Sequence, residues 1–459
     1  MQIINENKIE SILSGNLSAD PIRVREILAK ALEFGGLDLE EVACLSSVQN
    51  KDLIQEIFAA AKKIKNEIYG RRVVLFAPIY ISNFCKNECL YCAFRSTNKN
   101  LKRRFLETGQ IKKEVEYLVG QGHKRALMVL GESYPNDDFQ YALDAIKTIY
   151  EVKTEHGEIR RVNVNLAPTS VEEFKRLKDA GIGTYQLFQE TYHRKTYNQV
   201  HVSGKKADYD WRITVFDRAI QAGIDDVGFG VLFGLSDWRF EVLSLLEHAN
   251  YLQERFGVGP HTISVPRIWP ALGSKLASNP PDNVSDIDFC KIIAVLRLSV
   301  PYTGIILSTR ESPAVRREAL NLGVSQISAG SRTDPGGYGD SKLTNASQFS
   351  LGDHRSLEEV VRDVAESGYI PSFCTACYRR GRTGGEFMKL AKNCKIKKMC
   401  APNALATFAE YLNDYASPET QAVGEKLIQF EVASMVGEER KLTEALLVKI
   451  ESGKRDVFV

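Results

Sequence analysis

The sequence predicts an α/β fold: a closed (βα)8 barrel of the TIM type, with a helical segment before it and a helical extension after it. From about residue 71 to residue 370, short apolar, β-branched runs alternate with amphipathic helical stretches. Eight such strands, each followed by a helix, fit a closed parallel barrel over about 300 residues. An open, doubly wound sheet is the alternative architecture.

The elements divide the chain into residues 1–70, 71–370 and 371–459. The first segment is predicted to be helical, because apolar residues recur at helical spacing and Gly70 ends the last run. The third segment begins with cysteines and ends in amphipathic helices. The barrel strands between them are expected at 73–82, 125–131, 161–168, 184–190, 226–234, 262–268, 304–309 and 324–330.

The composition is that of an ordinary globular protein, with 44% hydrophobic and 26% charged residues. A formal net charge of +2 favours neither nucleic acid nor a membrane surface as a partner. The sequence shows no signal pattern and no run long enough to span a membrane, so we expect a cytoplasmic protein. Nine cysteines in a reducing compartment are metal ligands or buried residues rather than disulfides.

Three of these cysteines, Cys85, Cys89 and Cys92, directly follow the first predicted strand, where the active-site loops of a barrel emerge. Closely spaced thiolates can each bind a different iron of one cluster. Three ligands leave one iron of a 4Fe–4S cluster open, and an open iron can chelate the amino and carboxylate groups of a small molecule. A zinc site would normally show a fourth ligand nearby, and the sequence has none.

This C-x3-C-x2-C loop, with an aromatic residue (Tyr91) before its last cysteine and a βα barrel after it, resembles the radical S-adenosylmethionine (SAM) enzymes. The resemblance implies that the open iron holds S-adenosyl-L-methionine, which one electron cleaves to a 5′-deoxyadenosyl radical. It also implies cofactor contacts at other strand tips. Gly131 and Glu132 would receive the cofactor's amino group.

Further cofactor contacts come from the fourth strand and the helix after it. Gln189, Glu190 and Tyr192 end the fourth strand, where a carboxylate can accept hydrogen bonds from ribose hydroxyls. Arg212 begins the following helix and would pair with the cofactor carboxylate, with Arg218 as the alternative.

A second cysteine group, Cys374-x2-Cys377 followed by Cys400, lies beyond the barrel. Together with "PIYISNFCKNECLYC", "YQLFQETYH", "GVGPHTISVPRI" and "CTACYRRGRTG", it resembles the radical SAM tyrosine lyases of FeFe-hydrogenase maturation. The resemblance implies an auxiliary 4Fe–4S cluster with a fifth, labile iron, held by His261 and bridged by free L-cysteine. Cys394 departs from that pattern. It is a spare thiol, or else the fourth ligand of a structural zinc.

The tips of the last two strands supply candidate substrate contacts. Arg310 is a fork for a substrate carboxylate, with Ser308 beside it and Ser328 and Ser331 on the next strand. Aromatic amino acid lyases of the resembled superfamily hold the substrate carboxylate with such residues. The alternative for Arg310 is an ion pair with Glu311.

The resemblance therefore implies a lyase that cleaves the Cα–Cβ bond of L-tyrosine to p-cresol and dehydroglycine. Dehydroglycine would then yield CO and cyanide at the auxiliary cluster, for the FeFe-hydrogenase active site. Its partners would be a flavodoxin- or ferredoxin-type electron donor and other hydrogenase maturases. The alternatives are the 2-iminoacetate synthase of thiamine biosynthesis, a tryptophan lyase, or a non-catalytic iron–sulfur carrier.

Overall fold

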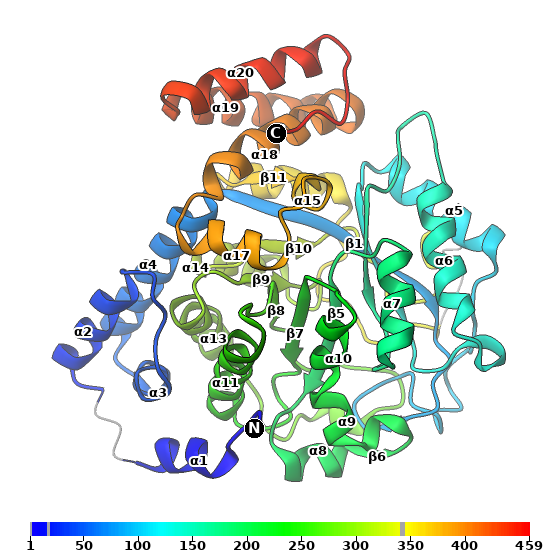
Figure 1. The fold of residues 1–459 in the computed structure, drawn as a ribbon, viewed down its shortest axis with the longest axis vertical. Coiled ribbons are helices and arrows are strands. Elements are labelled where there is room, and N and C mark those ends of the chain that lie inside the picture. Colours follow the sequence, from blue (N-terminus) through cyan, green and yellow to red (C-terminus); the bar gives the residue numbers. More distant parts are fainter. Residues whose placement is uncertain (1, 16–18, 340–344) are drawn as a thin grey trace.

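The computed structural model describes residues 2–15, 19–339 and 345–459 (Figure 1). Eight parallel strands form its centre, in the order β10-β9-β8-β7-β5-β4-β3-β1, and β1 pairs with β10 to close the ring. The predicted barrel is confirmed, and each of its strands coincides with a predicted segment. The strands are β1 (Arg72–Ser82), β3 (Arg125–Leu130), β4 (Arg161–Asn165), β5 (Tyr185–Glu190), β7 (Val227–Val231), β8 (Thr262–Ser264), β9 (Gly304–Leu307) and β10 (Gln326–Ser328).

Helices cover the outside of the barrel (Figure 1). Several begin at a serine or aspartate whose side chain accepts a backbone N–H, as Ser170 and Ser356 do in capping boxes. These caps fix the residue at which each of these helices begins. The barrel helices are α5 (Thr108–Gly120), α6 (Gln140–Glu151), α7 (Val171–Asp179), α10 (Val215–Gln221), α11 (Trp238–Phe256), α13 (Asp286–Ser299), α14 (Pro313–Leu322) and α15 (Leu357–Glu366).

The N-terminal segment is helical, as predicted, and packs against the barrel. Its long helix α4 contacts both α13 and α14, and ends at Gly70, which has a φ of 67°. The helices are α1 (Glu6–Ser14), α2 (Pro21–Ala31), α3 (Leu39–Ser47) and α4 (Lys51–Tyr69).

The C-terminal segment starts with a strand that the sequence did not predict. β11 (Ile370–Ser372) pairs in parallel with the first residues of β1, so the cysteine-rich segment leaves from the N-terminal end of the barrel. Figure 1 shows the last helices at that end, with α8 and α9 at the other. The helices are α16 (Ala376–Arg379), α17 (Gly384–Lys392), α18 (Lys397–Tyr415), α19 (Pro418–Ser434) and α20 (Gly437–Glu451).

Short elements complete the opposite end, at the C-terminal tips of the barrel strands. β2 (Glu88–Cys89), inside the first cysteine loop, pairs in antiparallel fashion with β6 (His201–Ser203). The pair ties the loop to the connection after β5. The remaining helices are α8 (Arg194–Val200), α9 (Tyr209–Ile213) and α12 (Lys275–Ser278).

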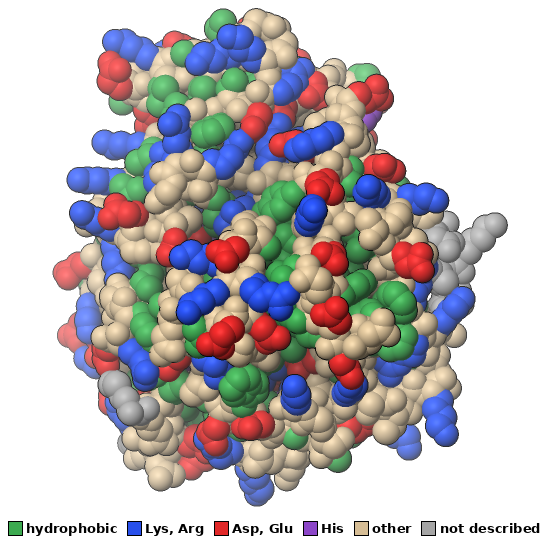
Figure 2. Space-filling view, turned by 45° about the vertical axis from the view of Figure 1, so that its right-hand side comes forward, with side chains coloured by type: hydrophobic (Ala, Val, Ile, Leu, Met, Phe, Trp, Pro, Cys, Tyr) green, Lys and Arg blue, Asp and Glu red, His purple; other side chains and the backbone are tan. Residues whose placement is uncertain are grey.

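The surface carries charges of both signs. Figure 2 shows basic and acidic side chains interspersed over the face turned toward the viewer, without a broad field of one sign. Among the described residues, no helix is both long enough and apolar enough to cross a membrane.

Candidate active site and auxiliary metal centre

The barrel interior holds two cavities that share no lining residue. The tip cavity lies at the C-terminal strand ends and is lined by Cys85, Cys89 and Cys92. The base cavity lies at the N-terminal strand ends and is lined by Cys374, Cys377 and Cys400. The two cysteine triads therefore occupy opposite ends of one barrel.

The first cysteine loop is braced by side chains from elsewhere in the chain. The guanidinium of Arg103 donates to the carbonyl oxygens of Asn83 at 2.7 Å and Phe94 at 2.8 Å. The hydroxyl of Tyr91 lies 2.8 Å from Nε2 of His201, on β6. Arg103 was not among the predicted site residues.

The three thiols are largely removed from water. Burial raises the pKa of Cys85 and Cys89, and that of Cys92 to about 11. Only thiolates ligate iron, so binding a cluster here must release protons from the triad.

Gly131 lets the β3 tip approach the cysteine loop closely. A Cβ atom at this position would lie 2.2 Å from the carbonyl oxygen of Phe84, which no side chain tolerates. Gly131 thus lies directly against the residue before Cys85, and Glu132 after it reaches Asn87 in the same loop.

Two carboxylates and two cations form a compact network in the tip cavity. Glu132 accepts from Nη1 of Arg212 at 2.9 Å and from Nδ2 of Asn87 at 2.8 Å. Lys206 donates to Glu190 at 2.6 Å, and Arg212 Nη2 lies 3.6 Å from the same carboxylate. Burial would raise the pKa of Glu132, but the charges of Arg212 and Lys206 hold it below its usual value.

Such a balanced network complements a zwitterion, because an ammonium and a carboxylate can exchange partners within it without adding net charge. Arg212, and not Arg218, belongs to the network. Arg218 lies over the ring of Trp211, 3.6 Å from its centre. Lys206 and Asn87 were not predicted.

Arg310 lines the tip cavity next to Ser308, and Ser328 lines it from the neighbouring strand. The guanidinium carbon of Arg310 lies 3.3 Å from the centre of the Phe349 ring. No carboxylate of a described residue forms an ion pair with it, since Glu311 binds Arg267 instead, with Nε and Oε1 3.1 Å apart. Burial lowers the pKa of Arg310.

Three predicted contacts do not line the tip cavity. Gln189 lies outside it, because Gln186, Phe188 and Glu190 of the same strand line it and neighbouring side chains alternate across a strand. Tyr192 is buried away from it, with its hydroxyl 2.7 Å from Nδ1 of His248. Ser331 is buried beyond the end of β10, and it too is absent from the cavity wall.

The base cavity brings His261 together with the second cysteine triad. Nδ1 of His261 lies 3.3 Å from the carboxylate of Asp226, which also accepts from the backbone N–H of Gly384 at 2.9 Å. Arg125 donates to the carbonyl oxygen of Cys374 at 2.8 Å. Residues at the starts of β3, β7 and β8 thus hold the cysteine segment to the barrel.

The walls of the base cavity fit a polar, metal-containing occupant. Nε of Arg72, Nε of Arg125 and Oγ1 of Thr375 are buried there without a hydrogen-bond partner among the described residues. Burial raises the pKa of Cys374, and that of Cys377 to about 12, so these thiols too lose protons on ligation.

A four-cysteine zinc site does not fit this arrangement. Cys394 does not line the base cavity; it lies two residues beyond the end of α17, with a φ of 54°. Within the described part of the chain, no three His, Cys, Asp or Glu side chains lie close enough to share a single metal ion. A multi-iron cluster needs ligands spread around it rather than converging on one point.

Comparisons with known proteins agree with this geometry. The radical SAM superfamily model matches residues 79–246, and that of the biotin and thiamin synthesis associated domain matches residues 264–370. The barrel and its cysteine loop define a radical SAM enzyme, a class whose cofactors are a 4Fe–4S cluster and SAM.

The relatives narrow the class. A crystal structure of HydG, a maturase of the FeFe-hydrogenase, is 49% identical, covers 100% of both chains and has a TM-score of 0.96. HydG from Carboxydothermus hydrogenoformans is 41% identical, with 96% of this chain and 97% of that chain covered and a TM-score of 0.83. 2-Iminoacetate synthase from Salmonella typhimurium is 31% identical over 78% of this chain and 91% of that enzyme. The chain belongs to the HydG family of FeFe-hydrogenase maturases.

Proposed function

We propose that this maturase cleaves the Cα–Cβ bond of L-tyrosine in the tip cavity, giving p-cresol and dehydroglycine, and converts dehydroglycine to CO and cyanide in the base cavity. One observation carries the proposal: a single barrel interior holds two cavities, each lined by three cysteines. Two separate reaction sites suit two successive reactions.

In the tip cavity, Cys85, Cys89 and Cys92 would hold the cluster, and Glu132, Glu190, Lys206 and Arg212 would hold SAM. Glu132 would accept from the cofactor's ammonium, Arg212 would pair with its carboxylate, and Glu190 would accept from the ribose hydroxyls. When bound, the two cofactors supply a one-electron reagent that abstracts a hydrogen atom. The protein's part is to orient the reactants and to exclude water.

Tyrosine would bind deeper in the tip cavity. The guanidinium of Arg310 has no ion-pair partner among the described residues and is available to a carboxylate, and Ser308 and Ser328 add hydroxyl donors beside it. Phe76, Phe94 and Ile306 supply apolar wall for the phenol ring.

In the base cavity, Cys374, Cys377 and Cys400 would hold the auxiliary 4Fe–4S cluster. His261 would ligate a fifth, labile iron, for which free L-cysteine would be the bridging ligand. The carboxylate of Asp226, 3.3 Å from Nδ1, would orient the imidazole, as carboxylates do behind metal-bound histidines.

The thiamine-type 2-iminoacetate synthase is the second candidate, because it shares the barrel and is 31% identical. The match to the biotin and thiamin synthesis associated domain ends at residue 370, before Cys374. The base-cavity triad favours the maturase reaction over one that stops at dehydroglycine.

The reaction needs an electron from outside, so we propose a flavodoxin- or ferredoxin-type donor and, downstream, other hydrogenase maturases that accept the iron product. None of the nine cysteines, all of which lie among the described residues, is in a disulfide. This suits the reducing cytoplasm, where we propose that the reaction takes place.

The test is an anaerobic assay of reconstituted, reduced protein with SAM and tyrosine, comparing wild type with a Cys374→Ala, Cys377→Ala double variant. Wild type should form p-cresol, CO and cyanide; the double variant should form p-cresol alone. Cys290→Ala, a buried thiol on α13, is the matched control. Absence of p-cresol from wild type would sink the lyase assignment. Wild-type p-cresol without CO would favour the thiamine-type reaction.

A further inference from the structure

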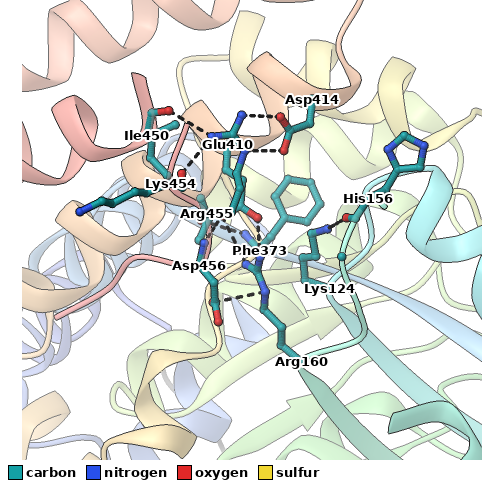
Figure 3. Close-up of polar contacts among 12 residues, drawn as sticks. Lys124, His156, Arg160, Phe373, Glu410, Asp414, Ile450, Lys454, Arg455 and Asp456 are labelled. Atoms are coloured by element: carbon teal, nitrogen blue, oxygen red, sulfur yellow. Dashed lines mark hydrogen bonds and ion pairs between the residues drawn. The ribbon is translucent and has the colours of Figure 1, made fainter. Parts of the chain in front are cut away.

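Residues 456–459 lie against the segments that carry the cysteines of the base cavity, and we call them the clasp. Figure 3 shows Asp456 facing Arg160 beside Glu410, while Arg455 turns to Asp414. The mechanism above gives the clasp no role, although its contacts concentrate around two of the cysteine-bearing helices.

One side of the clasp binds α16, the helix that carries Cys377. The carboxylate of Asp456 pairs with both terminal nitrogens of Arg379, at 2.8 Å for Nη2 and Oδ1. The ring of Phe458 lies 4.0 Å from the Arg379 guanidinium carbon and 5.3 Å from that of Arg380. Arg379 lies two residues after Cys377, so these contacts fix the end of its helix.

The other side of the clasp binds α18, the helix that carries Cys400. The backbone N–H of Val459 donates to Oδ1 of Asn403 at 2.9 Å, and Nδ2 of Asn403 donates back to the Val459 carbonyl at 3.2 Å. The N–H of Asp456 donates to Glu410 at 2.9 Å. Asn403 lies three residues after Cys400, within one helical turn of it.

Arg382 joins the two sides. Its backbone N–H donates to the carbonyl of Cys377 at 2.9 Å. Its guanidinium donates to the carbonyl of Val459 at 2.5 Å, and Nη1 lies 3.1 Å from Sδ of Met399, the residue before Cys400.

The clasp is anchored on the barrel by a buried arginine. Arg160, with 6% of its side chain exposed, lies with Nε 3.2 Å from Asp456 and Nη2 2.5 Å from Glu410. Asp456 has a φ of 58°, in the left-handed region that non-glycine residues seldom adopt. These ion pairs hold it there.

We propose that the clasp holds Cys377 and Cys400 at the separation that the auxiliary cluster requires, with Asp456 as a positioning residue. This inference rests on the proposed function of the base cavity. α16 has four residues, too few for a helix to persist unaided, and glycines with positive φ at 381 and 384 follow it. The position of Cys377 therefore depends on contacts from outside its own segment, and the clasp supplies them.

The test is Asp456→Asn, which keeps the shape of the side chain and removes the charge that binds Arg379 and Arg160. Glu438→Gln, at a side chain 91% exposed on α20, is the matched control. Four quantities are measured: iron and sulfide per chain, the EPR signals of the two clusters, the ratio of CO to p-cresol, and alkylation of Cys377 and Cys85 in cluster-free protein.

We expect Asp456→Asn to keep the first cluster and p-cresol formation, and to lose auxiliary iron and its EPR signal. The ratio of CO to p-cresol should fall about tenfold, the usual effect of removing a residue that orients a metal ligand. Cys377 should be alkylated faster than in wild type while Cys85 is unchanged, and Asp456→Glu should restore part of the auxiliary iron.

Wild-type iron content and unchanged Cys377 alkylation in Asp456→Asn would overturn the proposal. A parallel loss of p-cresol and CO with a lowered unfolding temperature would also overturn it, since that pattern means a general role in folding. Failure of the proposed function looks different: wild type itself would bind no auxiliary iron and release no CO, and the clasp proposal would fall with it.

Discussion

The guanidinium of Arg310 lies over the ring of Phe349 in the wall of the tip cavity. It forms no ion pair with a described carboxylate. A half-buried cation without a partner anion among the described residues is unfavourable, and a bound carboxylate removes that cost. Arg310 therefore favours a substrate with a carboxylate, such as an amino acid, over a substrate without one.

We expect Arg310→Lys to raise the KM for tyrosine about tenfold, because lysine cannot form the two parallel hydrogen bonds of a guanidinium. Steady-state p-cresol formation measures it. Arg218→Lys, which changes an arginine stacked on Trp211 outside the cavity, should leave KM unchanged. Equal KM values in the two variants would contradict the assignment of Arg310.

Lys206 gives a second prediction at this scale. Lys206→Met should weaken SAM binding at least about tenfold, because it leaves Glu190 short of its closest cation. The change of the cluster EPR signal on SAM titration measures the affinity. Lys205→Met, at the exposed neighbouring position, is the control, and wild-type affinity in Lys206→Met would refute the role.

At the scale of elements, β5 and α11 share one buried carboxyl group. Glu241 of α11 accepts from the hydroxyl of Thr191 and, at 2.9 Å, from the N–H of Tyr192. It thereby holds the chain just beyond Glu190, which itself has a φ of 72°. Burial raises the pKa of Glu241 to about 8.

This carboxyl makes stability depend on pH. Its folded pKa exceeds the usual 4.5, so its stabilising effect is complete below pH 4.5 and is lost as pH rises through about 8. The free energy of unfolding falls by about 1.4 kcal/mol for each pH unit in between. Glu241→Gln should therefore unfold at a higher temperature than wild type at pH 9, and the gap should close near pH 5.

Thermal unfolding of cluster-free protein measures this difference. Glu254→Gln, at an exposed position of the same helix, is the control and should follow wild type at both pH values. A Glu241→Gln variant with wild-type pH dependence would show that this group does not set it.

The elements and their side chains differ in how well the sequence predicts them. Strand positions were predictable because each buried run is visible as an apolar, β-branched stretch of the sequence. The loop of Cys85, Cys89 and Cys92 was visible too, because these residues lie close in sequence. Gln189 does not line the tip cavity, which the alternation of Gln186, Phe188 and Glu190 toward the cavity could have indicated. Lys206 and Arg103 were out of reach, because their partners are set by the fold of distant loops.

At the scale of the molecule, the two cavities that hold the cysteine triads share no lining residue. We therefore expect the triple variant Cys85→Ala, Cys89→Ala, Cys92→Ala to keep the auxiliary iron and its EPR signal while forming no p-cresol. Iron analysis and EPR of the reconstituted variant measure this. Loss of both clusters together would show that the two ends of the barrel do not load independently.

Strand β1 passes both sites: Arg72 and Val74 line the base cavity, and Phe76, Pro78 and Tyr80 line the tip cavity. From Arg72 to Tyr80 the strand covers roughly 26 Å at about 3.3 Å per residue. Because β1 is one continuous strand paired along both edges, it keeps the two cavities at a fixed distance from each other. Neither cavity can move toward the other to transfer a product. A product that passes between the two cavities must therefore be small enough to diffuse from one to the other.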